Sequence, residues 1–301
     1  MINWNTLSNH IRLATLSSFS HTHAVPVTGG DSNQTHLLSG SNGLGKQHVL
    51  KYFIKLNRAD KTKMFAAETA ALAELAKTQT IKLPLAITHG IADEHCFLVL
   101  EYLDLRSQGN YTLLGTQLAE LHRNYASQFG WSLNNTIGVT PQHNARSSDW
   151  ISFWGEQRLG FQLELASFNG CGKKLQALGK SIVDALPDIF SGYTPKPSLL
   201  HGDLWGGNHA FLADGTPVIF DPASYYGDRE TDIAMTELFG GFAPEFYAAY
   251  EYSYPLDSGY SNRKVIYNLY HILNHLNMVS RSYESQAIYL IQTIQRNLIH
   301  S

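Results

Sequence analysis

The sequence predicts an α+β fold of two lobes, in which a small N-terminal lobe carries an antiparallel sheet and a larger C-terminal lobe is mainly helical. Short apolar segments with strand-like alternation are concentrated in residues 1–103. Leucines at helical spacing follow a polar linker at residues 104–110. A chain of 301 residues with 44% hydrophobic content can bury the core of such a molecule. We therefore expect lobes of residues 1–103 and 104–301.

The N-terminal segment predicts a helix over residues 3–16 and then two short strands, at residues 24–28 and 35–38. The turn between these strands is rich in glycine and small polar residues. Such a turn can place backbone N–H groups around phosphates, although a plain hairpin is the alternative. The phosphate-binding interpretation involves Gly29, Gly30, Ser32 and Asn33.

The next strand candidate, residues 49–57, carries Lys51 and Lys55 on one face. In the helix predicted at residues 64–77, Glu68 lies on an apolar face. Because a carboxylate in such surroundings needs a cationic partner, we expect Glu68 to pair with Lys55, at the end of the apolar run, rather than with Lys51. The alternative is a solvated Glu68 at the edge of the helix.

The apolar segment at residues 96–103 predicts a further strand that leads into the polar linker. This is a suitable place for a hinge between lobes, where backbone groups around Glu101 and Leu103 would bind the edge of an adenine ring. After the linker, four leucines predict the first core helix of the second lobe, namely Leu113, Leu114, Leu118 and Leu121.

Residues 201–208, HGDLWGGN, are the most informative stretch of the chain, and they predict the catalytic loop of a kinase-like phosphotransferase. In such a loop an Asp accepts the proton of the attacking hydroxyl, and an Asn five residues later binds a Mg²⁺ ion carried by ATP. Asp203 and Asn208 have this spacing, and a short apolar strand ends in a second metal-binding carboxylate, Asp221. A turn with a capping Asp, the alternative for HGD alone, does not explain all three residues in register. We therefore expect ATP and Mg²⁺ as cofactors.

Three residues around this loop are expected to support it. His201 is predicted to brace the loop rather than to transfer a proton. Asp232 precedes an apolar helix start, and it either ties down the backbone of the catalytic loop or caps the helix. Asp228 has the same two alternatives.

Together these motifs resemble the fructosamine/ketosamine-3-kinase family, which has a protein-kinase-like fold and is related to aminoglycoside and choline phosphotransferases. The likeness runs over nearly the whole chain. Its motifs are HGDLWGGN at 201–208, FDPASYYGDRETDIAM at 220–235, LFGGF at 238–242, LYHILNHLN at 269–277 and, upstream, DWISFWGEQRL at 149–159. The resemblance implies transfer of the γ-phosphate of ATP to the O3 hydroxyl of a ribulosamine, erythrulosamine or fructosamine, on a small molecule or on a glycated protein lysine. Loss of that phosphate would then release the amine.

Candidate acceptor contacts follow from this resemblance. Trp205, two residues after Asp203, offers an aromatic face to a sugar, or else it is a packed structural residue. His271 and Asn274 lie on one side of a late helix, where they either border the acceptor pocket or belong to the interior.

Composition limits the partners. Lys and Arg number 22 against 25 acidic residues, a formal net charge of -3, so neither nucleic acid nor a membrane surface is expected as a partner. Only two cysteines are present, and no signal peptide or membrane-spanning run is evident. We expect a monomer in the reducing cytoplasm.

Two other functions remain open at this point. The first is a kinase for a different small alcohol, such as an aminoglycoside or choline, which would share Asp203, Asn208 and Asp221. The second is a catalytically silent nucleotide-binding module, against which the intact set of these three residues argues.

Overall fold

The computed structural model describes residues 2–27, 33–43 and 49–300, and the chain divides into two compact units. Unit 1 comprises residues 1–109 and 210–220, and unit 2 comprises residues 110–209 and 221–301. The linker at 104–109 and the segment 210–220 thus belong to the first compact unit, whereas the sequence suggested a boundary after Leu103. The functional division into a nucleotide-binding lobe of residues 1–103 and a catalytic lobe of residues 104–301 stays a prediction.

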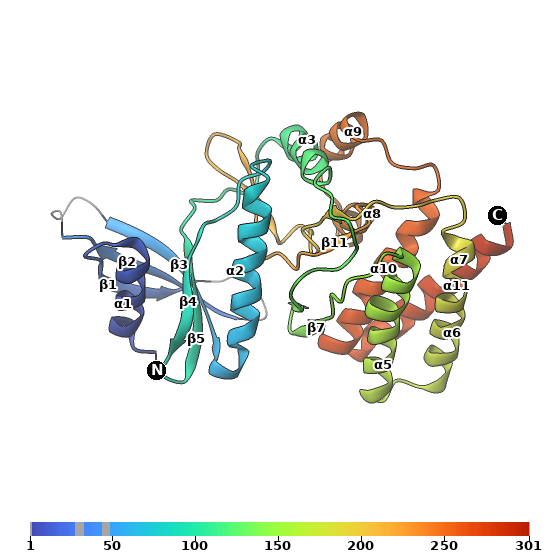
Figure 1. Cartoon of the computed structure of the whole chain (residues 1–301), viewed down its shortest axis with the longest axis horizontal. Helices are drawn as coiled ribbons and strands as arrows, with labels where there is room; N and C mark the ends of the chain where they lie inside the picture. The colour runs from blue at the N-terminus through green and yellow to red at the C-terminus, as the bar shows by residue number, and fades with distance from the viewer. Residues whose placement is uncertain (1, 28–32, 44–48, 301) are drawn as a thin grey trace. The chain divides into compact units, whose positions relative to one another are not determined.

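Unit 1 is built on a five-stranded antiparallel sheet with the strand order β1-β2-β3-β5-β4, and helix α2 runs alongside it (Figure 1). Strands β9 and β10 form a separate two-stranded hairpin. The elements are α1 (Trp4–Thr15), β1 (Ser20–Pro26), β2 (Gln34–Ser41), β3 (Val49–Arg58), the 3₁₀ turn η1 (Ala59–Lys61), α2 (Thr62–Lys77), β4 (Ala86–Ala92), β5 (His95–Glu101), β9 (His209–Phe211) and β10 (Pro217–Ile219).

The two faces of β3 have different surroundings. Tyr52, Ile54 and Leu56 share a buried cluster with Leu7 and Ile11 of α1. Because side chains alternate along a strand, the residues between them point to the opposite face. Lys55 is one of these, and it is nevertheless buried, with 3% of its surface exposed. The fold therefore places a lysine where it needs a partner of opposite charge.

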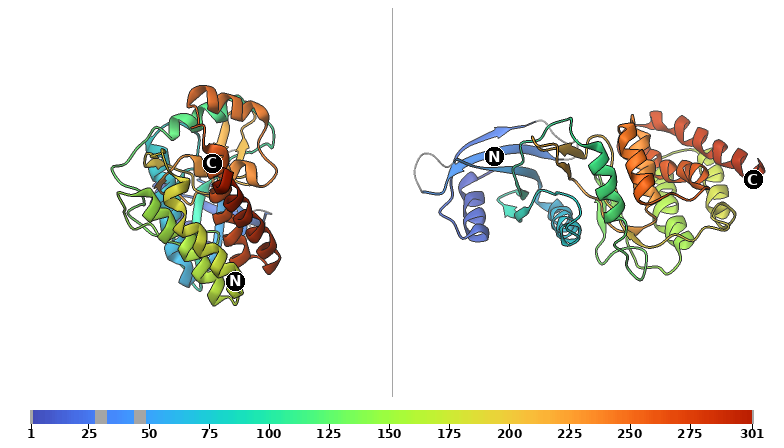
Figure 2. Two further views of the ribbon diagram at one scale, coloured as in Figure 1. Left: turned by 90° about the vertical axis from the view of Figure 1, so that its right-hand side faces the viewer. Right: turned by 90° about the horizontal axis from the view of Figure 1, so that it is seen from above.

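Unit 2 is mainly helical, and in the left view of Figure 2 helix α6 lies beside α11. Its elements are α3 (Tyr111–Leu121), β6 (Asn135–Ile137), β7 (Thr140–Gln142), α4 (Trp150–Trp154), the π-helix η2 (Gly155–Gly160), α5 (Phe161–Phe168), α6 (Lys173–Asp184), α7 (Leu186–Ile189), β8 (Ser198–Leu199), β11 (Tyr226–Gly227), α8 (Glu230–Leu238), α9 (Pro244–Ser253), α10 (Tyr260–Met278), η3 (Arg281–Tyr283) and α11 (Glu284–His300).

Most predicted elements are present with shifts of a few residues at their ends, and the α+β class is confirmed. The first helix begins where Asn3 accepts hydrogen bonds from the N–H groups of Asn5 and Thr6. Strand β4 was not predicted; its sequence, AITHGIA, mixes β-branched residues with glycine and alanine, and the strand pairs with β5. Among residues 2–27, 33–43 and 49–300, no helix combines the length and apolar content needed to cross a bilayer.

Helices α3 and α9 approach closely at Gly115, which gives a test of the packing in unit 2. A Cβ atom at Gly115 would lie 2.3 Å from the backbone oxygen of Phe246. Since a backbone cannot rotate away, we expect Gly115→Ala to lower the free energy of unfolding by roughly 1–3 kcal/mol in a urea titration. Gly172, where a Cβ would meet nothing within 4 Å, is the matched control. Equal losses in Gly115→Ala and Gly172→Ala would contradict close packing of α3 on α9.

Candidate active site

The backbone of the predicted catalytic loop turns sharply just before Asp203. Gly202 has a φ of +84°, and a Cβ atom there would lie 2.2 Å from the backbone oxygen of Ala223. Only glycine combines this left-handed conformation with such a close approach. His201 is fully buried, and its Nδ1 accepts a hydrogen bond from the Asp203 N–H at 3.2 Å. His201 thus braces the loop through the backbone, as expected.

Asp203 and Asn208 are brought together at the end of this loop. The Asn208 Nδ2 donates to the backbone oxygen of Asp203 at 2.8 Å and to its Oδ2 at 3.1 Å. Burial, followed by the charge of Asp221, raises the pKa of Asp203 to about 7, against the lowering effect of the Asn208 hydrogen bond. A half-buried carboxylate with this pKa is suited to accept a proton near neutral pH.

Asp221 follows strand β10 and has a φ of +58°, a left-handed conformation that Asp tolerates at some cost. The amide nitrogen of Asn208 donates to Asp203, so the amide oxygen is the atom that would bind a metal. A carboxylate and an amide oxygen are the hard ligands that Mg²⁺ prefers. A cation would also relieve the repulsion between Asp203 and Asp221. The residues present therefore fit the ion that the sequence predicts.

Asp232 holds the loop from behind. Its Oδ2 accepts from the His201 N–H at 2.7 Å, and its Oδ1 accepts from the Gly202 N–H at 2.8 Å. His122 lies 3.1 Å from Oδ2 through its Nε2. Although burial raises the pKa of Asp232, hydrogen bonds that its carboxylate accepts, led by that from His122 and including that from the Gly202 N–H, help to bring it below its ordinary value. Of the two alternatives for Asp232, the loop-bracing role is the one observed.

The support extends behind Asp232 into a buried chain of hydrogen bonds. Burial lowers the pKa of His122, so the ring is neutral, and it donates from Nε2 to the Asp232 carboxylate. Its Nδ1 then accepts from the Tyr250 hydroxyl at 2.8 Å, and that hydroxyl accepts from Arg229 at 3.0 Å. The sequence did not indicate that Arg229, at the start of α8, and Tyr250 of α9 would extend this series of hydrogen bonds, because the two residues meet only in the folded unit.

Asp228 has the second of the two predicted roles, that of capping a helix. Its Oδ1 accepts from the Glu230 N–H at 3.0 Å, at the start of α8, and from the Tyr193 hydroxyl at 3.0 Å. Tyr267 donates to Oδ2. Asp228 therefore supports the N-terminal end of α8 and does not contact the catalytic loop through these bonds.

In unit 1, the predicted pairing of Lys55 with Glu68 is confirmed. The Nζ of Lys55 lies 2.5 Å from Oε1 of Glu68, and the two side chains are 4% and 11% exposed. Lys51 is exposed, with its Nζ 5.3 Å from the centre of the Tyr102 ring. The solvated alternative for Glu68 is therefore wrong.

The remaining nucleotide-binding predictions in unit 1 are only partly visible. Gly29, Gly30 and Ser32 lie outside the described residues, while Asn33 accepts from Asn57 Nδ2 at 2.8 Å. The Glu101 carboxylate lies 3.1 Å from the Nζ of Lys82, and the Glu101 N–H donates to the Leu85 oxygen at 2.8 Å. Leu103 follows the end of β5, and its backbone N–H and C=O form no backbone hydrogen bond within the described ranges. Their roles at a nucleotide stay predictions.

The three acceptor candidates differ in exposure. Trp205 is 39% exposed, its ring lies against Gly207, and Phe239 packs edge-on to it with the ring centroids 6.3 Å apart. Asn274 is only 2% exposed, and its amide contacts Gln162 at 3.2 Å. His271 is 4% exposed, and burial lowers its pKa to about 3. These values favour the interior alternative for Asn274 and His271, whereas Trp205 remains accessible.

The two-unit α+β fold and the loop around Asp203 define a phosphotransferase of the protein-kinase-like class. The chain belongs to the fructosamine kinase family, whose model matches residues 3–297. It is 43% identical over 297 residues to a probable ketoamine kinase of Synechocystis, with 97% of each chain covered. It is 39% identical over 251 residues to the chloroplastic protein-ribulosamine 3-kinase of Arabidopsis thaliana, covering 82% of this chain and 77% of that protein.

Solved structures agree with this assignment. A "putative fructosamine-3-kinase" of Haemophilus somnus superposes with a TM-score of 0.85 and 32% identity, covering 97% of both chains. An aminoglycoside phosphotransferase in complex with gentamicin has a TM-score of 0.60 at 13% identity, covering 100% of this chain and 98% of the other. The second likeness shows a shared fold alone.

Opposite pKa shifts at two aspartates of the site predict opposite effects on stability. The pKa of Asp203 is raised, so its contribution to stability is present at acidic pH and is lost as the pH rises from about 4 through about 7. Asp203→Asn should therefore raise the melting temperature at pH 8, by about 2 °C or more, and have little effect near pH 4.5.

Asp232 is the matched control, because its pKa is lowered and its charged form stabilises the fold above its ordinary pKa. Asp232→Asn should lower the melting temperature at pH 8 in the same scanning calorimetry series. A lower melting temperature for Asp203→Asn at pH 8 would refute the inferred electrostatic cost at that residue.

Proposed function

We propose that this enzyme transfers the γ-phosphate of ATP to the O3 hydroxyl of ketosamines, with Mg²⁺ as the metal. The observation that carries the proposal is the loop in which Asp203 stands beside the amide of Asn208 and has a pKa of about 7. Relatives that share most of the chain and are named ketoamine or ribulosamine kinases support the choice of acceptor.

Asp203 acts on the acceptor hydroxyl. Its carboxylate orients the O3 hydroxyl and takes its proton as the bond to phosphorus forms. A base with a pKa near the operating pH balances the fraction that is deprotonated against proton affinity. Asp232 keeps this carboxylate in place by holding the peptide groups of His201 and Gly202.

Asn208 and Asp221 would hold the magnesium ion through the amide oxygen and the carboxylate. When bound, Mg²⁺ neutralises negative charge on the phosphates. The same positive charge would lower the pKa of Asp203, since the charge of Asp221 is one of the causes that raise it. The metal-loaded enzyme should therefore keep its base deprotonated at neutral pH.

Unit 1 would supply the nucleotide contacts. Lys55, held by Glu68, is proposed to bind phosphate oxygens, and the turn containing Gly29, Gly30, Ser32 and Asn33 to surround them with N–H groups. Backbone groups of Glu101 and Leu103 are proposed to bind the adenine edge.

On the acceptor side, we assign Trp205 to the wall of the sugar site, with His271 and Asn274 as weaker candidates because of their burial. A phosphate at O3 of a ketosamine is a good leaving group once the neighbouring ketoamine enolises. Elimination then releases inorganic phosphate, and hydrolysis releases the original amine. The reaction would therefore repair glycated amines.

The setting of the reaction is also a proposal. We infer a monomer in the reducing cytoplasm that acts on small ketosamines or glycated protein lysines, with no nucleic-acid or membrane partner. The net charge of -3 supports the expectation of no nucleic-acid or membrane partner.

A double-mutant cycle tests the role of the ion pair in unit 1. If Lys55 binds phosphate only when Glu68 holds it, then Lys55→Met and Glu68→Gln should each reduce kcat/KM for ATP, and the losses should be strongly non-additive. Lys51→Met is the control on the same strand, and it should leave kcat/KM within about twofold. Additive losses, or a larger effect of Lys51→Met, would assign the phosphate contact elsewhere.

A substrate panel tests the reaction. Ribulosamines, erythrulosamines, fructosamines, an aminoglycoside and choline are incubated with the enzyme and Mg-ATP, and the products are followed by mass spectrometry. We expect one added phosphate on a ketosamine, followed by slow release of free amine and inorganic phosphate. Asp203→Asn should lower kcat by about 100-fold or more while it still binds ATP. A stable phosphate on the aminoglycoside or choline, with none on any ketosamine, would leave a kinase but overturn its substrate.

A further inference from the structure

The short β6–β7 hairpin of unit 2 sends two amide side chains to the backbone just after Asp221. Gln142 Nε2 donates to the backbone oxygen of Ala223 at 2.9 Å, and Asn135 Nδ2 donates to that of Ser224 at 2.9 Å. Gln142 and Asn135 are 1% and 9% exposed. Buried amides with this geometry are strong positional constraints, because an unmet donor or acceptor would be costly there.

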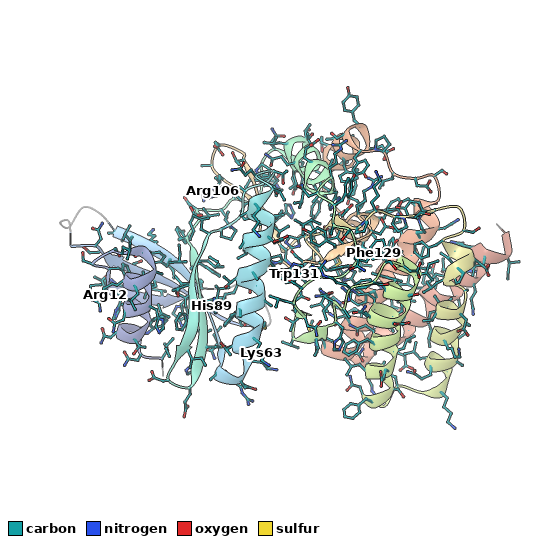
Figure 3. The ribbon with its side chains drawn as sticks, viewed as in Figure 1. Arg12, Lys63, His89, Arg106, Phe129 and Trp131 are labelled. Atoms are coloured by element: carbon teal, nitrogen blue, oxygen red, sulfur yellow. The ribbon has the colours of Figure 1, made fainter. Side chains whose placement is uncertain are left out.

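The other side of the same segment is bonded to the catalytic loop and its neighbours. The Ala223 N–H donates to the His201 oxygen at 2.9 Å, and the Leu200 N–H donates to the Tyr225 oxygen at 3.0 Å. Tyr226 exchanges backbone hydrogen bonds with Gly130, which lies between Phe129 and Trp131, both labelled in Figure 3. The chain after Asp221 is therefore held from two sides.

Behind the hairpin lies a buried arginine whose partners are neutral. Arg158 is in the π-helix η2 and is fully buried, and its guanidinium centre lies 4.1 Å from the ring centre of Tyr225 and 4.6 Å from that of Phe153. It donates to Asn144 Oδ1 at 2.7 Å and to the backbone oxygens of His143 and Gln157. Within the described part of the chain, no carboxylate forms an ion pair with it. A buried cation of this kind is expensive, and π-helical turns often accompany function.

The guanidinium determines which way the amides of Asn144 and Asn135 point. Arginine only donates, so Asn144 accepts at Oδ1 and donates from Nδ2 to Asn135 Oδ1 at 2.9 Å. Asn135 must then present its own Nδ2, which reaches the Ser224 oxygen. At the other end, the backbone oxygens only accept. The orientation of these amides is therefore set by the groups at both ends of this series of hydrogen bonds.

Gln142 is oriented independently by Tyr270. The Tyr270 hydroxyl donates to Gln142 Oε1 at 2.7 Å, which leaves Nε2 to donate to Asn135 Oδ1 at 2.9 Å and to the Ala223 oxygen. Two separate donors, Arg158 and Tyr270, thus specify one arrangement of the hairpin amides.

We propose that Gln142 and Asn135, oriented by Tyr270 and Arg158, are positioning residues that keep the Asp221 carboxylate where it binds magnesium. The inference rests on the proposed function, because it takes Asp221 as a metal ligand. Asp221 has a left-handed φ, and such a conformation persists only where the surrounding structure determines it. The hydrogen bonds from Gln142 and Asn135 to the backbone oxygens of Ala223 and Ser224, two and three residues after Asp221, constrain the backbone there.

The test compares two buried glutamines of unit 2. Gln142→Met removes the donor to Ala223 while keeping the size of the side chain. Gln162, which is also fully buried and bonds Asn274 and Asn277 instead, becomes the matched control Gln162→Met. The dissociation constant of ADP is measured by calorimetry in excess Mg²⁺ and in EDTA, and the ratio of the two values gives the metal-dependent gain in affinity. Melting temperatures are recorded for both variants.

Both variants should lose thermal stability, since each leaves a buried hydrogen-bond partner unmet. Only Gln142→Met should lose the metal-dependent gain, by about tenfold, as supporting groups around metal ligands typically do. Tyr270→Phe, a milder change, should lower the gain by about twofold or more and keeps the test decisive if Gln142→Met does not fold.

Asp221→Ala separates the two levels of the argument. If Asp221→Ala retains the wild-type gain, the proposed metal site is wrong, and this inference fails with it. If Asp221→Ala removes the gain while Gln142→Met and Tyr270→Phe keep it, the metal site stands and the positioning role is overturned. An equal loss in Gln142→Met and Gln162→Met would also overturn it, because a general loss of stability would then explain the effect.

Discussion

The conformation of the catalytic loop depends on one residue, the buried carboxylate of Asp232. Burying this charge is unfavourable unless its oxygens are hydrogen bonded, and here the N–H groups of His201 and Gly202 and the ring of His122 meet that need. The two N–H groups belong to the peptides that directly precede Asp203. A requirement of folding, to satisfy a buried charge, therefore has the consequence of setting the direction of the catalytic base.

Two features of the candidate active site lower the stability of the folded protein. Burial, and after it the nearby charge of Asp221, raises the pKa of Asp203 to about 7, and Asp221 has a left-handed backbone. Neither feature favours folding of the empty protein, and both are suited to receiving a cation. The cost is met by a well-bonded surround, with Asp232 on one side and the hairpin amides of Gln142 and Asn135 on the other.

In unit 1 the buried group is a cation, and it too has a partner from another element. Lys55 is buried because strand alternation in β3 turns it away from the face that packs on α1, and Glu68 of α2 compensates its charge. Removal of either partner would leave an uncompensated buried charge, which is why the two act as a pair. In both units, a polar group needed for chemistry is retained in the interior by a partner supplied from a different element.

The sequence by itself determined the class of the protein and the main chemical groups. HGDLWGGN with Asp221 identified the catalytic loop, because that chemistry requires a base and metal ligands at short, constant spacings along the chain. Helical and strand periodicity placed α1, β3, α2 and α3 within a few residues. The apolar face of α2, together with the kinase arrangement in which a helix glutamate pairs with a strand lysine, predicted the pair of Glu68 and Lys55.

Tertiary structure alone decided which residues support those groups. The choice between bracing and capping for Asp232 depended on where His201 and Gly202 come to lie, and no periodicity encodes that. Tyr250, Asn135 and Gln142 gave no sequence signal, and Arg158 stood only within a family motif without an assigned role, since each comes from a separate element and bonds residues well apart in the sequence. Strand β4 likewise exists through its pairing with β5. Local spacing specifies groups that act through adjacent residues, whereas buried polar partners are specified only by the packing that brings distant residues together.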